Sequence, residues 1–519
     1  MRADASTTNT PTQHDADAAH LASLGYSYDK QFKREMSFFG NVSLGFTYLS
    51  PVVGVYSLFA VSLASAGPPM LWSLLIVAVG QMMVALVFGE VVSNFPVSGG
   101  VYPWSRRLWG RRWAWMNGWV YLISLLVTIA SVAYGSGMYL GALFGFEPGP
   151  STTITCALGM IAIATLLNFG GTKVVSLAAS IGLIAELGGA LIVGGGLIVF
   201  ARHNDLGVLF NGFGSADNFG GNYFAAFAAA GLIGVYQYYG FEACGDVAEE
   251  VPNPGRQIPK AMRMTIYVGG AAATFVCLSL ILATPDIAAV VRGDVADPVG
   301  AALLSAFGPI GYRIVLLVVL ISFASCVLSL QAAASRLGYS LARDHMLPLS
   351  GLLGRFSDRL HVPPFALLVA GLVPAGIILG SRVSTNALTA IISFASLGIY
   401  LGFQMVVIAA LRARLKGWKP AGAFTLGKWG LPANLLALGW GATGIINMVW
   451  PRTPGAPWYE NYLVLISGVV VVTAGLIYML AAKPYLKSDT PHGDAHVDPM
   501  QKTPTALASD GAVRKEKAQ

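Results

Sequence analysis

Apolar runs of about 20 residues recur along this chain, and they limit its possible folds more than any other feature. A run of that length can cross about 30 Å of hydrocarbon as a helix. Only 11% of the residues are charged, whereas soluble proteins average about 25%. The sequence therefore predicts an all-α integral membrane protein. Twelve spans are expected, at residues 38–62, 70–93, 115–143, 152–169, 174–200, 222–247, 262–283, 312–335, 364–381, 386–411, 430–450 and 460–482.

Polar segments flank the predicted helical region. Residues 1–35 are expected to form a polar tail, residues 36–482 a twelve-helix domain, and residues 483–519 a disordered tail that cannot bury a core. The first 20 residues contain no apolar stretch after a basic start, so no cleaved signal peptide is expected.

Lysines and arginines predict how the spans are oriented. If both termini are in the cytoplasm, all but five of the 32 basic residues fall on the cytoplasmic side of the membrane. The formal charge of +7 therefore reflects membrane topology and not nucleic-acid binding. Arginines alternate with tryptophans from Trp104 to Trp113. This pattern predicts an interfacial helix whose arginines face anionic lipid.

Two spans contain helix breakers near their midpoints. The first has Ser-Pro-Val-Val-Gly at residues 50–54, where proline removes a backbone donor and glycine loosens the helix. The sixth has Gly240 among large polar and aromatic residues at 236–242. Interrupted helices in corresponding positions of two halves point to a transporter binding site. For Pro51 taken by itself, the alternative is a simple kink in a packed helix.

Three separated motifs follow one another along the chain. The first begins at Gly89-Glu90 and continues as Asn-Phe-Pro-Val-Ser-Gly-Gly-Val-Tyr over residues 94–102. The second is Gly-Phe-Glu at 240–242, then Ala-Glu-Glu-Val-Pro-Asn-Pro at 248–254 and Ile-Pro-Lys-Ala at 258–261. The third runs from Ser335-Arg336 to Leu347-Pro348. Together they resemble the amino acid–polyamine–organocation superfamily, most closely its amino acid/choline permease branch, over roughly residues 37–480.

This resemblance implies two inverted five-helix repeats with broken first and sixth spans, two peripheral helices, and alternating access. It also implies that the substrate binds at the two breaks. Free amides at a half-helix N-terminus suit a carboxylate, and freed carbonyls suit an ammonium group. Many amino acid members have Gly-x-Gly where this chain has Ser-Pro-Val-Val-Gly. Carried over by position, the candidate substrate contacts are Ser50, Pro51, Val52, Val53, Gly54, Tyr236, Gln237, Tyr238, Tyr239, Gly240 and Phe241.

Glu186 and Glu242 are the candidates for proton coupling. Several proton-coupled members have a lysine at the position that aligns with Glu186, near the middle of the fifth span. Burial favours the neutral carboxyl there, which could bind and release a proton; a hydrogen-bonded structural carboxyl is the alternative. Glu242 either completes the site or ties the sixth span to a neighbour. Ser322 and Ser325 could supply hydroxyls to a sodium site, although such serines more often bond back to their own helix.

Charged residues cluster near the predicted cytoplasmic ends of the sixth and eighth spans. They are expected to form salt bridges that close the inner mouth of the site. The members of this predicted gate are Glu249, Glu250, Arg336, Arg343 and Asp344. Glu90 is expected to cap a helix or to pair with loop arginines.

The predicted function is secondary active transport of an amino acid or small amine across the cytoplasmic membrane, by proton-coupled symport or exchange. The alternatives are a non-transporting nutrient sensor of the same fold, or a sodium-coupled, polyamine or choline carrier. No histidine lies at the centre of a span, and the four cysteines lack metal or redox spacing. We therefore expect no enzyme, no cofactor and no metal. The expected partners are a small-molecule substrate and the lipid bilayer, without nucleic acid; the oligomeric state stays open.

Overall fold

The computed structural model describes Ala22 and residues 32–147, 149–295, 297–382, 385–452, 455–488 and 490–495. These residues form helices and loops and no β-strand, apart from one isolated bridge between Ser357 and Val362. The predicted all-α class is therefore confirmed. Most of the two predicted tails lies outside the described residues.

Within the described residues, twelve helices have twelve or more residues. They are α2 (Phe38–Leu49), α3 (Pro51–Ala66), α4 (Met70–Asn94), α6 (Arg111–Phe144), α7 (Pro150–Phe169), α8 (Gly171–Phe200), α12 (Pro254–Ala283), α14 (Pro298–Arg343), α16 (Pro364–Gly380), α17 (Thr385–Leu415), α18 (Gly430–Val449) and α20 (Leu463–Ala482). The shorter helices are α5 (Val101–Leu108), α9 (Tyr223–Ala230), α10 (Leu232–Gln237), α11 (Ala243–Asp246), α13 (Ile287–Arg292), α15 (Ser350–Leu353) and α19 (Trp458–Asn461). Five 3-10 turns complete the described chain, η1 (Leu206–Phe210), η2 (Ser215–Phe219), η3 (Ala248–Glu250), η4 (Gly427–Trp429) and η5 (Pro484–Leu486).

Nine helices of the described chain are long and apolar enough to cross a membrane, with α2 and α3 taken together. A tenth span results if the bent pair Leu206–Phe219 and Tyr223–Gln237, which meet at 107°, is counted as one. The ninth and eleventh predicted spans correspond to α16, a shorter apolar helix, and to α18. Outer helices expose large apolar side chains such as Ile192 and Ile477. A surface of this kind is expected to face lipid.

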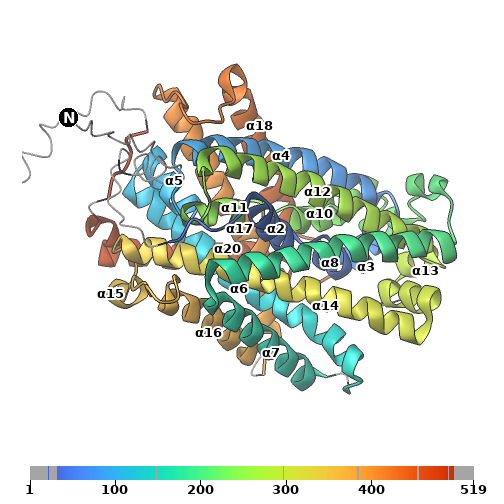
Figure 1. Cartoon of the computed structure of the whole chain (residues 1–519). Coiled ribbons are helices and arrows are strands. Elements are labelled where there is room, and N and C mark those ends of the chain that lie inside the picture. The colour runs from blue at the N-terminus through green and yellow to red at the C-terminus, as the bar shows by residue number, and fades with distance from the viewer. Residues whose placement is uncertain are drawn as a thin grey trace, which may run out of the picture.

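The long helices run side by side as one bundle, with α5 and α15 at one end and α13 at the other (Figure 1). Within it, α12 packs against α4, α17 against α6, and α14 against both α6 and α8. The interrupted first span packs against α8, α12 and α14. The segment from α10 to α11 packs against the same span. Both interrupted spans therefore lie inside the bundle.

The first break is at Ser50, between α2 and α3. Ser50 has φ 37° and ψ 93°, so the helix cannot continue through it. Its side-chain oxygen accepts a hydrogen bond from the Val53 amide at 3.3 Å and caps α3. Pro51 occupies the first position of α3, where its missing N–H costs nothing and its fixed φ suits a helix. The local sequence thus ends one helix and begins the next.

The second break lies between α10 and α11, where residues 238–242 belong to neither helix. Gly240 has φ +112°, which side-chain-bearing residues rarely adopt. A Cβ atom added to Gly240 would lie 2.6 Å from the backbone nitrogen of Leu49. The two breaks, predicted at 50–54 and 236–242, are therefore both present, and their backbones touch at the centre of the bundle.

The segment from Trp104 to Trp113 differs from its prediction. In α5, Trp104, Arg106 and Arg107 are buried in the protein and do not face lipid. Arg106 pairs with Asp344, and Arg107 pairs with Asp494 at 3.0 Å. The prediction that the arginines face lipid was wrong for Arg106 and Arg107, because two carboxylates from distant parts of the chain neutralise them.

The start of the predicted C-terminal tail packs against α5. The Gly493 amide donates to the Arg106 carbonyl at 2.8 Å, and the Thr490 hydroxyl donates to Asp344 at 3.0 Å. Burial, and then the neighbouring Arg111 guanidinium, lower the pKa of His492 below its usual range. Residues 490–495 thus contact the helical domain, in contrast to the predicted disordered tail. Residues 496–519 lie outside the described part of the chain.

Candidate functional site

A small cavity lies beside the meeting point of the two breaks. Three of the predicted substrate contacts line it, namely Val53, Tyr236 and Tyr239. The Tyr239 ring meets the rings of Tyr48 and Tyr236 edge-on, with centroids 6.1 and 5.5 Å apart. Aromatic faces of this kind attract cations. The complete lining is Tyr48, Leu49, Val53, Thr128, Val132, Tyr236, Tyr239, Cys326 and Leu330.

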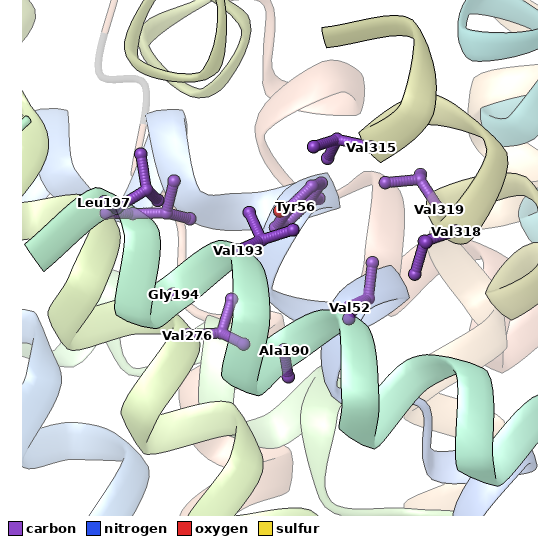
Figure 2. Close-up of a pocket in the computed structure, with 12 residues that line it drawn as sticks. Val52, Tyr56, Ala190, Val193, Gly194, Leu197, Val276, Val315, Val318 and Val319 are labelled. Atoms are coloured by element: carbon purple, nitrogen blue, oxygen red, sulfur yellow. The ribbon is translucent and has the colours of Figure 1, made fainter. Parts of the chain in front are cut away.

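A second cavity lies between α3, α8, α12 and α14, and its lining is almost wholly apolar (Figure 2). Val52, Tyr56, Ala190 and Val319 are among its lining residues. Val52 lines this cavity and Val53 lines the first one. The first turn of α3 therefore borders both cavities.

Two of the predicted substrate contacts, Tyr238 and Phe241, point away from the cavity at the breaks. The Tyr238 hydroxyl lies against Gly270 of α12, where a Cβ atom would come within 2.9 Å of it. Phe241 packs against the rings of Phe88 and Phe403, with centroids 5.9 and 5.5 Å away. Neither side chain lines the cavity at the breaks; both pack against neighbouring helices.

Glu186 of α8 is bound to the first break. Its Oε1 atom accepts hydrogen bonds from the Ser50 hydroxyl and the Val52 amide, both at 2.8 Å. The side chain is fully buried, and Oε2 has no hydrogen-bond partner among the described residues. A carboxylate at a helix N-terminus is favourable because the helix dipole is positive there. Glu186, a candidate for proton coupling, therefore lies directly at the first of the two breaks where the substrate is predicted to bind.

In the first turn of α3, every backbone N–H group donates to another group of the protein, except at Pro51, which has no N–H. The Val52 amide donates to Glu186. The Val53 and Gly54 amides donate to the side-chain and backbone oxygens of Ser50 at 3.3 and 3.0 Å. The expectation of free amides for a substrate carboxylate is therefore not met at this break. The sequence pattern could not show that a side chain from α8 takes one of these donors.

Gln237 links the two breaks. Its Nε2 atom donates to the Leu49 carbonyl at 3.1 Å, one of the carbonyls released where α2 ends. Its Oε1 atom is buried, faces Gly54, and has no partner within the described chain. Glycine at position 54 leaves the room that this side chain needs. Gln237 thus lies where the two breaks meet.

Glu242 holds the second break to α6. One carboxyl oxygen accepts from the Tyr121 hydroxyl at 2.7 Å, and the other accepts from the Gly240 amide at 2.8 Å. Of its two expected roles, these bonds favour tying the sixth span to a neighbour. Sequence reasoning missed Tyr121 and also Asp246, which is buried with both carboxyl oxygens lacking a partner among the described residues. Asp246 could have been identified from the sequence, because it follows the candidate residue Glu242 by four positions. Nothing in the sequence marks Tyr121 as a partner of Glu242.

The residues of the predicted gate form ion pairs in the structure. Glu250 accepts from Arg336 at 2.9 and 3.3 Å, and both side chains are fully buried. Glu249 accepts from Arg343 through two bonds of 3.1 Å. Asp344, the fifth predicted member, pairs with an arginine of α5. The two glutamate–arginine pairs join α14 to the segment that follows α11.

The structure also shows the partners of Glu90 and of the two serines considered for a sodium site, Ser322 and Ser325. Glu90 pairs with Arg414 near the end of α17 and accepts from the Leu426 amide at 2.8 Å. The expected pairing with an arginine is therefore present, although Arg414 lies in the last turn of α17 and not in a loop. Ser322 and Ser325 donate to carbonyls one turn earlier in α14, at 3.1 and 2.8 Å. This is the bonding back to the same helix that was the alternative to a sodium site.

The known proteins that this chain is similar to are amino acid permeases. A family model described as amino acid permease matches residues 39–474. The amino-acid permease BAT1 of Arabidopsis thaliana is 25% identical over 88% of this chain and 93% of its own. Amino-acid permease 2 of Neurospora crassa is 24% identical over 97% of this chain and 95% of its own. The branched-chain amino acid permease BcaP of Bacillus subtilis is 24% identical, with coverage of 74% and 82%.

Proposed function

The chain belongs to the amino acid permease family, and on that basis we propose that it is a secondary active transporter of an amino acid or small amine. It is a multi-pass membrane permease and not an enzyme. The observation that carries the proposal is the direct contact of two interrupted helices beside a cavity, at Leu49 and Gly240. Non-helical backbone inside a membrane is tolerated where it is enclosed by protein or lines a cavity.

The proposed architecture has twelve spans with both termini in the cytoplasm. In it, α16 and α18 are the ninth and eleventh spans, and the first ten spans form two inverted five-helix repeats. Support comes from the lengths of these two helices and from the placement of the basic residues. Alternating access would then open the site first to one side of the membrane and then to the other.

The buried pair Glu250–Arg336 is proposed to close the cytoplasmic side of the site. Replacing Arg336 by methionine leaves Glu250 buried without its charge partner, which typically costs about 3–5 kcal/mol. We expect a lower unfolding temperature and a loss of uptake. Replacing both residues by methionine should restore most of the stability, because apolar replacement of a whole buried pair is often neutral, but should leave transport defective.

The matched control for this gate variant is Arg292→Met. Arg292 pairs with Asp294 at 2.9 Å, and both side chains are more than half exposed. Exposed pairs contribute less than about 1 kcal/mol, so stability and uptake should stay close to those of the unmodified protein. Equal behaviour of the Arg336 and Arg292 variants would rule out the gate.

We propose proton coupling through Glu186 and Glu242, without an organic cofactor or metal. Glu186 supports this role because it is buried at the first break and one of its oxygens has no partner in the described chain. Glu242 supports it because it binds the second break through Gly240. A sodium ion is less well supported, since Ser322 and Ser325 donate to their own helix.

Uptake into proteoliposomes tests the function. Radiolabelled amino acids and amines are offered under an imposed pH gradient and, separately, under an imposed sodium gradient. We expect accumulation above equilibrium with the pH gradient alone, and the direction of the effective gradient distinguishes symport from exchange. Binding without uptake would identify a nutrient sensor and would refute the transporter proposal. Accumulation with the sodium gradient alone would refute proton coupling.

A further inference from the structure

At the centre of the bundle, the first turn of α3 is the place where backbone groups would attract an anion. Helix N-termini bind carboxylates and phosphates through free N–H groups and the helix dipole. Here Glu186 already takes the Val52 amide and the Ser50 hydroxyl at 2.8 Å. A substrate carboxylate at this turn would find its donors occupied and would lie beside a second carboxylate. While Glu186 is ionised, the two like charges in contact would oppose binding strongly.

Basic side chains could replace these donors only if they reached the site. In the described chain the fully buried basic residues are Arg106, Arg107 and Arg336. Arg106 is paired with Asp344, which follows α14, Arg107 with Asp494 of the C-terminal segment, and Arg336 with Glu250 after α11. Neither cavity beside α3 is lined by a lysine, arginine or histidine of the described residues. A substrate carboxylate would therefore find no cation there.

Two buried acceptors beside the first turn of α3 lack a donor among the described residues. Glu186 Oε2 and Gln237 Oε1 are both buried and have no hydrogen-bond partner within the described residues. Both side chains contact the first turn of α3, Glu186 at Val52 and Gln237 at Gly54. A buried acceptor left without a donor is costly, and an ammonium group carries up to three donors. The tyrosine rings of the adjacent cavity can hold the rest of a cation.

We infer that Glu186 fills the position of a substrate carboxylate, so that this site selects an organic amine with no carboxylate beside its ammonium group. The inference rests on the proposed transport function and narrows its substrate class. Gln237 and the free oxygen of Glu186 accept hydrogen bonds from the ammonium group. The carbon chain of the amine lies against Val53, Tyr236 and Tyr239.

Matched pairs of compounds test the inference without any variant. Each pair consists of an amino acid and the amine that lacks only its carboxylate: leucine and isoamylamine, phenylalanine and phenethylamine, lysine and cadaverine. Binding to the purified full-length protein in nanodiscs is measured by calorimetry, and uptake is measured in proteoliposomes. We expect the amine to bind at least about tenfold more tightly than its amino acid in at least one pair. Equal or tighter binding of the amino acid in every pair overturns the inference.

Two variants of Glu186 test whether this residue causes the preference for the amine over the amino acid. Glu186→Ala removes the carboxylate and releases the Val52 amide, so the ratio of amine to amino acid affinity should fall at least about tenfold. Glu186→Gln keeps an acceptor for that amide but removes the charge, so amine binding should weaken without a gain for the amino acid. Glu460→Gln, at an exposed position of α19, is the control and should leave the ratio unchanged. An unchanged ratio in Glu186→Ala overturns the assignment to Glu186.

Failure of this inference can be told apart from failure of the transport proposal. If amino acids are accumulated in proteoliposomes and their amines are not, the protein is a transporter and only the inference is wrong. If no member of any pair binds or is taken up, both the inference and the proposed function are wrong.

Discussion

Replacing Gly240 by alanine is expected to abolish uptake. The new Cβ atom would lie 2.6 Å from the Leu49 nitrogen and 3.0 Å from the Tyr48 carbonyl carbon, so it would push the two breaks apart. Gly240 also has φ +112°, which alanine adopts only with strain. Strain of this kind costs on the order of 1–3 kcal/mol before the clash is counted. Initial uptake rates in proteoliposomes and the unfolding temperature measure the effect.

Gly188→Ala is the matched control for this variant. Gly188 lies within α8, and a Cβ atom added there would meet nothing within 4 Å. Alanine is also the better helix former by about 1 kcal/mol. We therefore expect normal uptake and equal or higher stability for Gly188→Ala. If Gly240→Ala transports as well as this control, the meeting point of the two breaks is not the substrate site.

Glu186→Gln is expected to end accumulation driven by a pH gradient. Glutamine can still accept from the Ser50 hydroxyl and the Val52 amide, the two bonds of 2.8 Å that hold α3 to α8. It cannot bind and release a proton at neutral pH, because an amide does not titrate there. The variant should fold and equilibrate substrate, but should not concentrate it. The measurement is the inside-to-outside ratio of labelled substrate with and without an imposed pH gradient.

Glu460→Gln again serves as the control, since its side chain is exposed in α19, and its accumulation ratio should match that of the unmodified protein. Continued accumulation by Glu186→Gln would show that Glu186 does not carry the coupling. Glu242, which binds Gly240 and Tyr121 at the second break, would then be the next carboxyl to replace.

The features of the candidate site that could be predicted from the sequence are those that depend only on residues close together in the chain. Proline at 51 and glycine at 240 interrupt helices through their own backbone properties, so both breaks could be placed before any packing was known. The charged residues of the gate could be identified by type and position. Their pairing, Glu250 with Arg336 and Glu249 with Arg343, depends on where α14 lies relative to the loop after α11.

Other site features arise from contacts between distant segments. Glu186 reaches the first break from α8, and Tyr121 reaches Glu242 from α6. Arg106 is buried because Asp344 of the segment after α14 lies beside it. No periodicity or spacing in the sequence records which helices lie side by side. Sequence reasoning therefore expected free amides at the first break and lipid-facing arginines in α5, and the structure has neither.

The sequence by itself determined that this protein is a helical membrane protein and where two of its spans must come apart. It could do so because the length of apolar runs and the backbone limits of proline and glycine act within a few residues. Only the tertiary structure decided which groups occupy the space between the breaks. The burial of Glu186 against α3 and the contact of Gly240 with Leu49 follow from helix packing, which joins residues far apart in the chain.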